Sequence, residues 1–129
     1  MLKIIVDHYV EEVWNKKNLK FIKQTFSPKA VLHSLFGNFS GPDAMQVIAE
    51  TWIKGFPDLK VINDDFICEN DKVMVRWSSE GTHLGNFKGI PATGKRVHFT
   101  GMTIYRIEKD KVVEYWACLD MDYLLNQIR

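Results

Sequence analysis

The side chain best suited to acid–base chemistry is Asp120, near the end of the sequence. Alternation typical of a strand from Lys111 to Asp122 predicts that Asp120 shares one face with Trp116. A carboxylate beside an indole and other apolar groups is partly desolvated, and desolvation raises its pKa toward the value that a general base requires. We therefore expect Asp120 to be a catalytic acid–base residue. The alternative is a carboxylate at a strand end that only accepts hydrogen bonds.

Three histidines are candidates to assist this carboxylate. His33 is flanked by Val31 and Leu35 on its own strand face, so we expect it to point into a cavity and to assist proton transfer or orient a carbonyl. His83 belongs to a Gly-Thr-His segment and is expected at the rim, and His98 is expected on a pocket wall. No histidine pair has the HxH or HExxH spacing of a zinc site, so we predict no metal and no cofactor.

Arg76 is a further polar candidate for contact with a ligand. It alternates with Met74 and Ser78 in a strand-like run, and burying its charge without a partner would be costly. Its partner could be Asp120, Glu114 or a carboxylate of the substrate. An ion pair with Asp120 would lower the pKa of that aspartate and weaken it as a base.

Aromatic residues are numerous enough to line a pocket for a flat ligand. The chain has four tryptophans, four tyrosines and eight phenylalanines. A dry concave site lined by such side chains can hold a substrate close to its attack geometry. Together with Trp116, we expect Trp52, Phe56 and Phe87 to contact the ligand.

Hydrophobic spacing predicts helices first and strands afterwards. Apolar residues three and four apart predict a helix from Leu2 to Trp14 and a shorter one from Leu19 to Phe26, and Pro42 with Asp43 predicts the start of a third that ends at Gly55. Strands are predicted over Ala30–Phe36, Leu59–Cys68, Lys72–Glu80, Arg96–Ile107 and Lys111–Asp122.

This order of elements is typical of an α+β fold in which helices pack on one face of a curved antiparallel sheet. Polar turns between the later strands indicate hairpins. The segment Gly81–Lys95 is long for a hairpin connection and holds four glycines, so we interpret it as a rim or lid.

The composition limits the classes of partner. A length of 129 residues is typical of one domain, here residues 1–129, and the 17 basic and 16 acidic residues give a net charge of +1 with no long block of either sign. Nucleic acid and anionic membranes are therefore not expected as partners. No apolar run reaches the roughly 20 residues that cross a bilayer, and we expect a cytoplasmic protein that binds a small hydrophobic molecule.

A series of short motifs resembles one known family, the SnoaL-like polyketide (ester) cyclases. The resemblance runs from about His33 to the C-terminus and is carried by Phe56-Pro57-Asp58-Leu59, Asp71-Lys72-Val73, Arg76-Trp77, Gly81-Thr82-His83, Gly85, Phe87, Gly89-Ile90-Pro91, Thr93-Gly94-Lys95, Glu114, Trp116, Asp120, Leu124-Leu125 and Gln127. It implies the cone-shaped fold shared with nuclear transport factor, ketosteroid isomerases and limonene-type epoxide hydrolases. It also implies a homodimer.

The resemblance also implies a reaction. In this family one aspartate, matched here by Asp120, is the acid–base residue of an intramolecular aldol ring closure on a polyketide ester. Tyr123 stands where the family usually has glycine, which affects the pocket mouth and hence the substrate. We therefore expect a cyclase or isomerase acting on a small hydrophobic carbonyl compound. The alternatives are a non-catalytic binding module of the same fold and an epoxide hydrolase, which needs an Asp-Arg-Asp arrangement.

Overall fold

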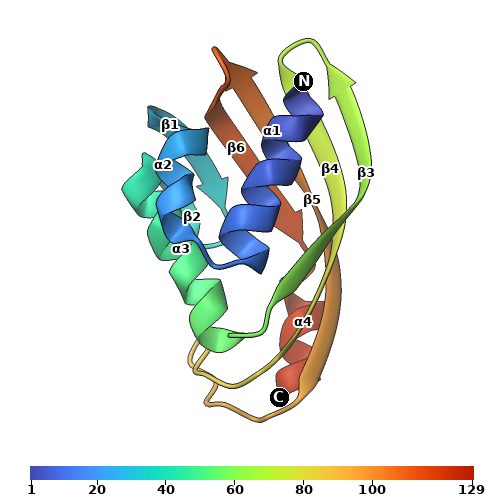
Figure 1. Ribbon diagram of the computed structural model, residues 1–129. Helices are drawn as coiled ribbons and strands as arrows, with labels where there is room; N and C mark the ends of the chain where they lie inside the picture. The colour runs from blue at the N-terminus through green and yellow to red at the C-terminus, as the bar shows by residue number, and fades with distance from the viewer.

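Six strands form one curved, unclosed sheet in the order β2-β1-β6-β5-β4-β3, and the helices of the N-terminal half cover one of its faces (Figure 1). The computed structural model describes all residues from 1 to 129. The helices are α1 (Leu2–Tyr9), which continues as the π-helix η1 (Val10–Asn15), the 3-10 turn η2 (Leu19–Phe21), α2 (Ile22–Thr25), α3 (Pro42–Gly55) and α4 (Met121–Ile128). The strands are β1 (Phe26–Ser34), β2 (Gly37–Ser40), β3 (Lys60–Glu69), β4 (Lys72–Thr82), β5 (Arg96–Glu108) and β6 (Lys111–Leu119).

The predicted α+β architecture is confirmed, with two differences, one at the C-terminus and one in the pairing of the strands. The last predicted strand stops at Leu119, because Asp120 caps a helix, α4, that was not predicted. The sheet also holds one parallel pair, β1 with β6, whereas every other pair of neighbouring strands is antiparallel.

The hydrophobic core lies between the helices and one face of the sheet, which we call the inner face. Buried apolar residues form a single cluster of 26 side chains. The first helical segment contributes Val6, Tyr9 and Val13, which are fully buried. In β5 alternate residues, such as Val97 and Phe99, point inward. The opposite, outer face of the sheet carries the intervening residues of each strand.

A β-bulge in β6 decides which of its residues face inward. Ile107 of β5 pairs with Val112, but the preceding residue Arg106 pairs with Glu114, so Val113 is an extra residue in the ladder. A bulge of this kind shifts the alternation by one residue. Val112 and Tyr115 are consequently both buried, and beyond the bulge the odd-numbered residues of β6 face inward.

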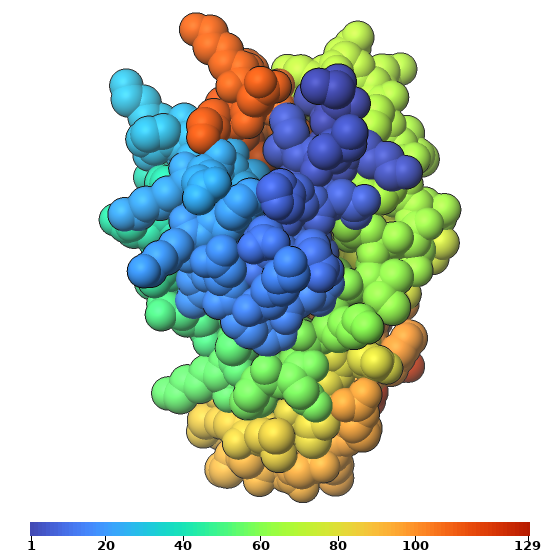
Figure 2. Space-filling view, in the orientation of Figure 1, coloured from blue at the N-terminus to red at the C-terminus, as the bar shows by residue number.

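The glycine-rich segment 81–95 is packed against the end of α3. The Leu84 and Gly85 amides donate to the carbonyl oxygen of Gly55. A Cβ atom at Gly85 would overlap the carbonyl oxygen of Lys54, so only glycine allows this approach. In Figure 2 the segment, yellow to orange, forms the lower end of the molecule directly below α3.

None of the helices is both long enough and apolar enough to cross a bilayer.

Candidate ligand cavity

A partly open cavity of about 60 Å³ lies between η1, α3 and the inner face of the sheet. Hydrophobic residues make up 12 of the 15 that line it, and the lining contains no aspartate, glutamate, histidine, lysine, arginine or cysteine. The residues are Val10, Trp14, Leu35, Trp52, Leu59, Val61, Asn63, Trp77, Ser79, Phe99, Thr103, Tyr105, Tyr115, Ala117 and Leu119.

Gly101 and Trp77 shape the floor of the cavity. They pair directly between β5 and β4, and a Cβ atom at Gly101 would overlap Cζ2 of the Trp77 indole. The indole therefore lies across the sheet over the glycine. Its Nε1–H donates to Oγ1 of Thr103 at 2.9 Å, which satisfies the one polar group of the indole and fixes its orientation.

Three buried tyrosines form one cluster, and two of them line the cavity. Tyr105 and Tyr115 pair directly across β5 and β6 and line the cavity, with ring centroids 5.6 Å apart. Tyr9 of α1 packs on Tyr105 at 6.0 Å and does not line the cavity, and its hydroxyl accepts a hydrogen bond from Trp14 Nε1 at 3.0 Å. Burial raises the pKa of all three phenols, because the charged form is penalised away from water.

A wider cleft of about 570 Å³ adjoins the cavity between α1, η1 and β3. Val10, Val61 and Asn63 line both spaces. Asn63 Nδ2 donates to Asp7 Oδ1 at 2.9 Å, which ties β3 to α1 at this junction. Its Oδ1 is fully buried and has no hydrogen-bond partner. The junction therefore presents an unsatisfied acceptor.

Of the aromatic residues predicted to contact the ligand, one lines the cavity and two pack behind it. Trp52 of α3 lines the cavity, as expected. Phe56 and Phe87 are fully buried and pack against Trp52 at ring-centroid distances of 6.4 and 4.9 Å without reaching the cavity. His83 is also fully buried, not at the rim, and its Nδ1 accepts from the backbone N–H of Thr93.

The expected inward orientation of Asp120 is wrong. Its side chain is exposed and is not part of the cavity wall. Oδ1 accepts a hydrogen bond from the backbone N–H of Tyr123 at 3.0 Å, the geometry of a helix N-cap. The cause is the bulge at Val113, which turns Trp116 outward and brings Leu119 to the cavity.

His33 and Trp116 lie together on the outer face, which corrects the expectation that they face the cavity. The two rings stack at 5.4 Å with an interplanar angle of 16°. His33 Nε2 is 2.9 Å from Oε2 of Glu114, and Arg106 pairs with the other carboxylate oxygen at 3.3 Å. The His33 hydrogen bond is the main cause of the lowered pKa of Glu114, and Arg106 adds to it.

Arg76 and His98 also lie on the outer face, so Arg76 does not reach the cavity and His98 does not form one of its walls. Arg76 donates from Nε to Asp65 Oδ2 at 2.7 Å, not to Asp120 or Glu114, and Asp64 lies 3.9 Å from its Nη1. This Asp-Arg-Asp group is exposed, and it cannot activate water in the cavity as an epoxide hydrolase would. The backbone of His98 exchanges hydrogen bonds with the Gln127 side chain of α4.

No group of three or more histidine, cysteine, aspartate or glutamate side chains is arranged to hold a metal ion. The cavity residues that the sequence did not mark as candidates include the tyrosine pair and Asn63, and Trp77 is marked only by the Arg76-Trp77 motif. For β5 a signal existed: positions 97, 99, 105 and 107 are uncharged and apolar, whereas 96, 98, 106 and 108 are polar or charged. That contrast marks the odd positions as the inner face.

Comparison with known proteins agrees with this architecture. Residues 4–128 match the family model described as SnoaL-like polyketide cyclase. AclR of Streptomyces galilaeus, a proposed hydroxylase, is 32% identical with a TM-score of 0.87, covering 98% of this chain and 80% of AclR. A proposed SnoaL-like polyketide cyclase from Jannaschia sp. CCS1 is 22% identical with a TM-score of 0.90, covering 98% and 90% of the two chains.

IdmH of Streptomyces antibioticus, a proposed polyketide cyclase, is 22% identical with a TM-score of 0.85 and covers 98% of this chain and 97% of its own. At this identity the likeness to IdmH and to the Jannaschia protein supports the fold alone. No curated protein matches the chain. The family match spans nearly the whole sequence, and the chain belongs to the SnoaL-like polyketide cyclase family.

Proposed function

We propose that the chain is a cyclase or isomerase that acts on a small hydrophobic carbonyl compound bound at the inner-face cavity. The observation that carries the proposal is this cavity, with 12 hydrophobic residues among its 15, in a chain of the cyclase family. Apolar walls with a few polar groups are typical of small-molecule sites. An apolar cavity shields the inserted part of a substrate from water and fixes its position, which favours an intramolecular ring closure.

The size of the cavity limits how a substrate can bind. A volume of about 60 Å³ is smaller than the roughly 150 Å³ that houses one benzene molecule. A polyketide-sized compound therefore inserts only one end, and its remainder lies in the adjoining cleft of about 570 Å³. We propose that the inserted end carries a carbonyl group and passes Asn63, the residue that the two spaces share with Val10 and Val61.

Asp120 is the proposed acid–base residue of the reaction. The carboxylate would take a proton from a carbon between two carbonyls, the resulting enolate would attack another carbonyl carbon of the same molecule, and the new alkoxide would recover the proton from the carboxyl group. Support comes from the family resemblance, from the position directly after the cavity residue Leu119, and from Oδ2, which accepts no hydrogen bond. Because Asp120 is exposed, the activated carbon must lie near the end of β6.

The second candidate is a non-catalytic module that binds a hydrophobic carbonyl compound. Two observations favour it: the exposed, capping position of Asp120, and a cavity wall whose only titratable side chains are tyrosines. A site of this kind binds a ligand but has no carboxylate or histidine inside the cavity that could act as a base.

Incubation with methyl 3,5,7-trioxo-7-phenylheptanoate, an ester whose C2 can attack its C7 carbonyl to close a six-membered ring, separates these functions. A cyclase gives a product of unchanged mass, or of a mass lowered by one water, with a new ultraviolet spectrum. The hydroxylase activity proposed for AclR would add the mass of one oxygen atom. Unchanged compound that nevertheless quenches tryptophan fluorescence indicates binding alone and would remove the enzyme proposal.

A pair of variants tests the role of Asp120. Asp120→Asn retains a good helix cap but no longer exchanges a proton. Asp122→Asn, two residues later in α4, removes the same charge from an exposed neighbour. We expect the first variant to lose turnover at unchanged stability and the second to retain it. Equal turnover in both would eliminate Asp120 as the base.

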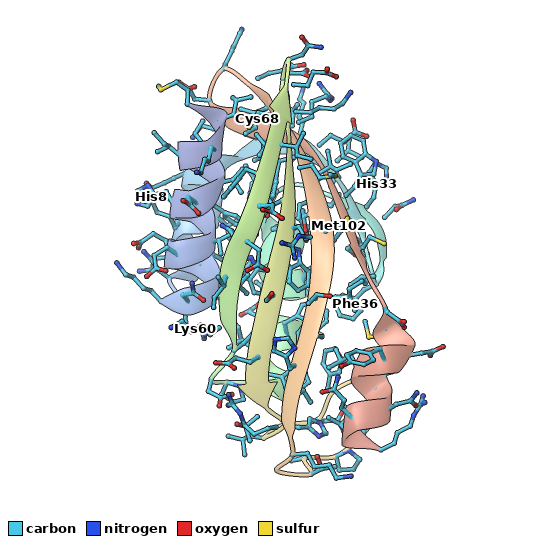
Figure 3. All side chains as sticks on the ribbon, turned by 90° about the vertical axis from the view of Figure 1, so that its right-hand side faces the viewer. His8, His33, Phe36, Lys60, Cys68 and Met102 are labelled. Atoms are coloured by element: carbon cyan, nitrogen blue, oxygen red, sulfur yellow. The ribbon has the colours of Figure 1, made fainter.

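We also propose that the outer face pairs two copies of the chain as a homodimer. Ile67, Met74, Ile104 and Trp116 form a continuous row across four strands by direct pairing, and Met102 lies beside it. Met102 is 49% exposed and Ile67 is 61% exposed. Figure 3 shows Met102 and His33 on the side of the sheet opposite α1. Such a row of apolar side chains exposed to water favours association.

Two ion pairs flank this row, Arg76 with Asp65 and Arg106 with Glu114. Each contains a positive and a negative charge, so the same face of a second copy can meet it with opposite charges. Sedimentation of Met102→Glu tests the dimer against Val47→Glu, which places the same charge at an exposed apolar residue of α3. The first variant should be monomeric and the second dimeric. A monomeric wild-type chain at high concentration would contradict the proposal.

A further inference from the structure

We propose that the hydroxyl groups of Tyr105 and Tyr115 together bind one oxygen atom of the ligand, the carbonyl oxygen at its inserted end. The inference rests on the proposed function, because it requires that the cavity takes a carbonyl compound. It goes further in naming the atoms that recognise the ligand and the part of the cavity in which its oxygen lies.

The two tyrosines are brought together by the sheet. They are direct partners across β5 and β6, both on the inner face, with their rings inclined at 64°. Only 4% of Tyr105 and 6% of Tyr115 is exposed. Phe26 packs edge-on against Tyr115 at 6.0 Å, and Tyr9 packs edge-on against Tyr105, so both rings are held from behind. Their positions are therefore fixed before a ligand binds.

Neither hydroxyl has a hydrogen-bond partner in the protein, although both residues are buried. Only two polar side-chain atoms are both fully enclosed and without a partner, Asn63 Oδ1 and His83 Nε2. Neither tyrosine hydroxyl is among these enclosed atoms, so each keeps some accessible surface, and the cavity is the space that both residues line. A buried hydroxyl without a partner costs free energy, so these groups favour an occupant that accepts hydrogen bonds.

Tyr9 shows the contrast within the same aromatic cluster. Its hydroxyl accepts from Trp14 Nε1 at 3.0 Å, and its ring lies outside the cavity wall. A tyrosine that serves packing alone has its hydroxyl satisfied in this way. The other two hydroxyls differ from it in both respects.

Burial favours the protonated form of the Tyr105 and Tyr115 hydroxyls, which can donate hydrogen bonds. Burial raises the pKa of both phenols, so each hydroxyl stays protonated at neutral pH and can donate. Donors fixed in an apolar site stabilise negative charge that develops on an oxygen more strongly than water-exposed donors do. A carbonyl oxygen would therefore be bound here, and negative charge that develops on it would be stabilised.

The test compares cyclopentanone with methylenecyclopentane, which has the same shape but a CH₂ group in place of the oxygen. Binding of each to the full chain is followed by tryptophan fluorescence, since Trp14, Trp52 and Trp77 line the cavity. The variants are Tyr105→Phe and Tyr115→Phe, and Tyr9→Phe is the matched control. Denaturant unfolding of each variant confirms that it folds.

One hydrogen bond to a neutral acceptor corresponds to a change in affinity of up to about tenfold. We expect the ratio of ketone to alkene affinity to fall by about 3- to 10-fold in each cavity variant and to stay unchanged in Tyr9→Phe. A purely structural role would change both affinities equally and leave the ratio as it is, which would overturn the inference while the cavity remained a binding site. Failure of both probes to bind the wild-type chain would instead refute the cavity proposal and the inference with it.

Discussion

Replacing Gly101 with alanine should both destabilise the fold and reshape the cavity. The added methyl group would overlap Cζ2 of Trp77 and would lie 2.7 Å from the backbone carbonyl oxygen of Cys118. The indole can turn aside, but the strand backbone cannot do so without disturbing β6. Overpacking of this kind costs about 1–3 kcal/mol. Displacement of the indole also loses its hydrogen bond to Thr103, worth about 1 kcal/mol.

The expected loss in the free energy of unfolding is therefore about 2–4 kcal/mol, a large part of the roughly 5–15 kcal/mol typical of a domain. Urea unfolding followed by circular dichroism measures it. Thr100→Ala is the control, because its side chain is exposed on the outer face of the same strand and its loss should change stability by less than about 0.5 kcal/mol.

A double-mutant cycle identifies the cause of the loss. Trp77→Phe removes the ring atoms that the new methyl group would overlap, so Gly101→Ala should cost less in that background than in the wild-type chain. The overlap with the Cys118 carbonyl oxygen remains, so rescue should be partial. If Gly101→Ala were as stable as the wild type, or equally costly in both backgrounds, the assignment of Trp77 to the cavity floor over Gly101 would be refuted.

Three further predictions concern stability. The three buried tyrosines have raised pKa values, so their contribution to the free energy of unfolding is complete below the ordinary phenol pKa of about 10 and is lost as pH rises toward their pKa values in the folded chain. Tyrosinate absorbance should therefore appear together with unfolding. Its appearance in a folded chain would contradict the burial of these residues. Asp120→Ala should lower the free energy of unfolding by about 0.5–2 kcal/mol through loss of the α4 cap, and Asp120→Ser should restore most of it in urea titrations. Gly85→Ala should detach segment 81–95 from α3 and speed its proteolysis, because the methyl group would overlap the Lys54 carbonyl oxygen; unchanged proteolysis would show that this packing is not required.

Much of the fold could be predicted because its signals are local. The helical spacing of the first residues and Pro42 at the start of α3 indicate the helices directly. Alternation indicates β3 to β6 in the same way. The sequence does not reveal helix α4, because its N-cap, Asp120, follows the strand without a break and the predicted strand continues to Asp122.

The site was harder to predict because the side that a strand residue faces depends on pairing between distant segments. A single extra residue, Val113, reverses the alternation in β6, and nothing in its own neighbourhood marks it as a bulge. The sequence therefore places Trp116 on the wrong face. Tyr115 was overlooked for the same reason. Only the sheet register shows that Tyr115 lies opposite Tyr105. The inward orientation expected for His33 rests on its neighbours Val31 and Leu35, but Val31 is 41% exposed and Leu35 lies beyond the end of β1.

The central claim is that the inner-face cavity receives the carbonyl end of a hydrophobic compound, and a crystal structure of the chain soaked with acetophenone tests it most directly. We predict ligand density in the cavity, with the ketone oxygen within hydrogen-bond distance of the Tyr105 and Tyr115 hydroxyls and the ring directed toward Val61 and Asn63. An empty cavity with acetophenone bound only on the outer face or in the cleft would contradict the claim.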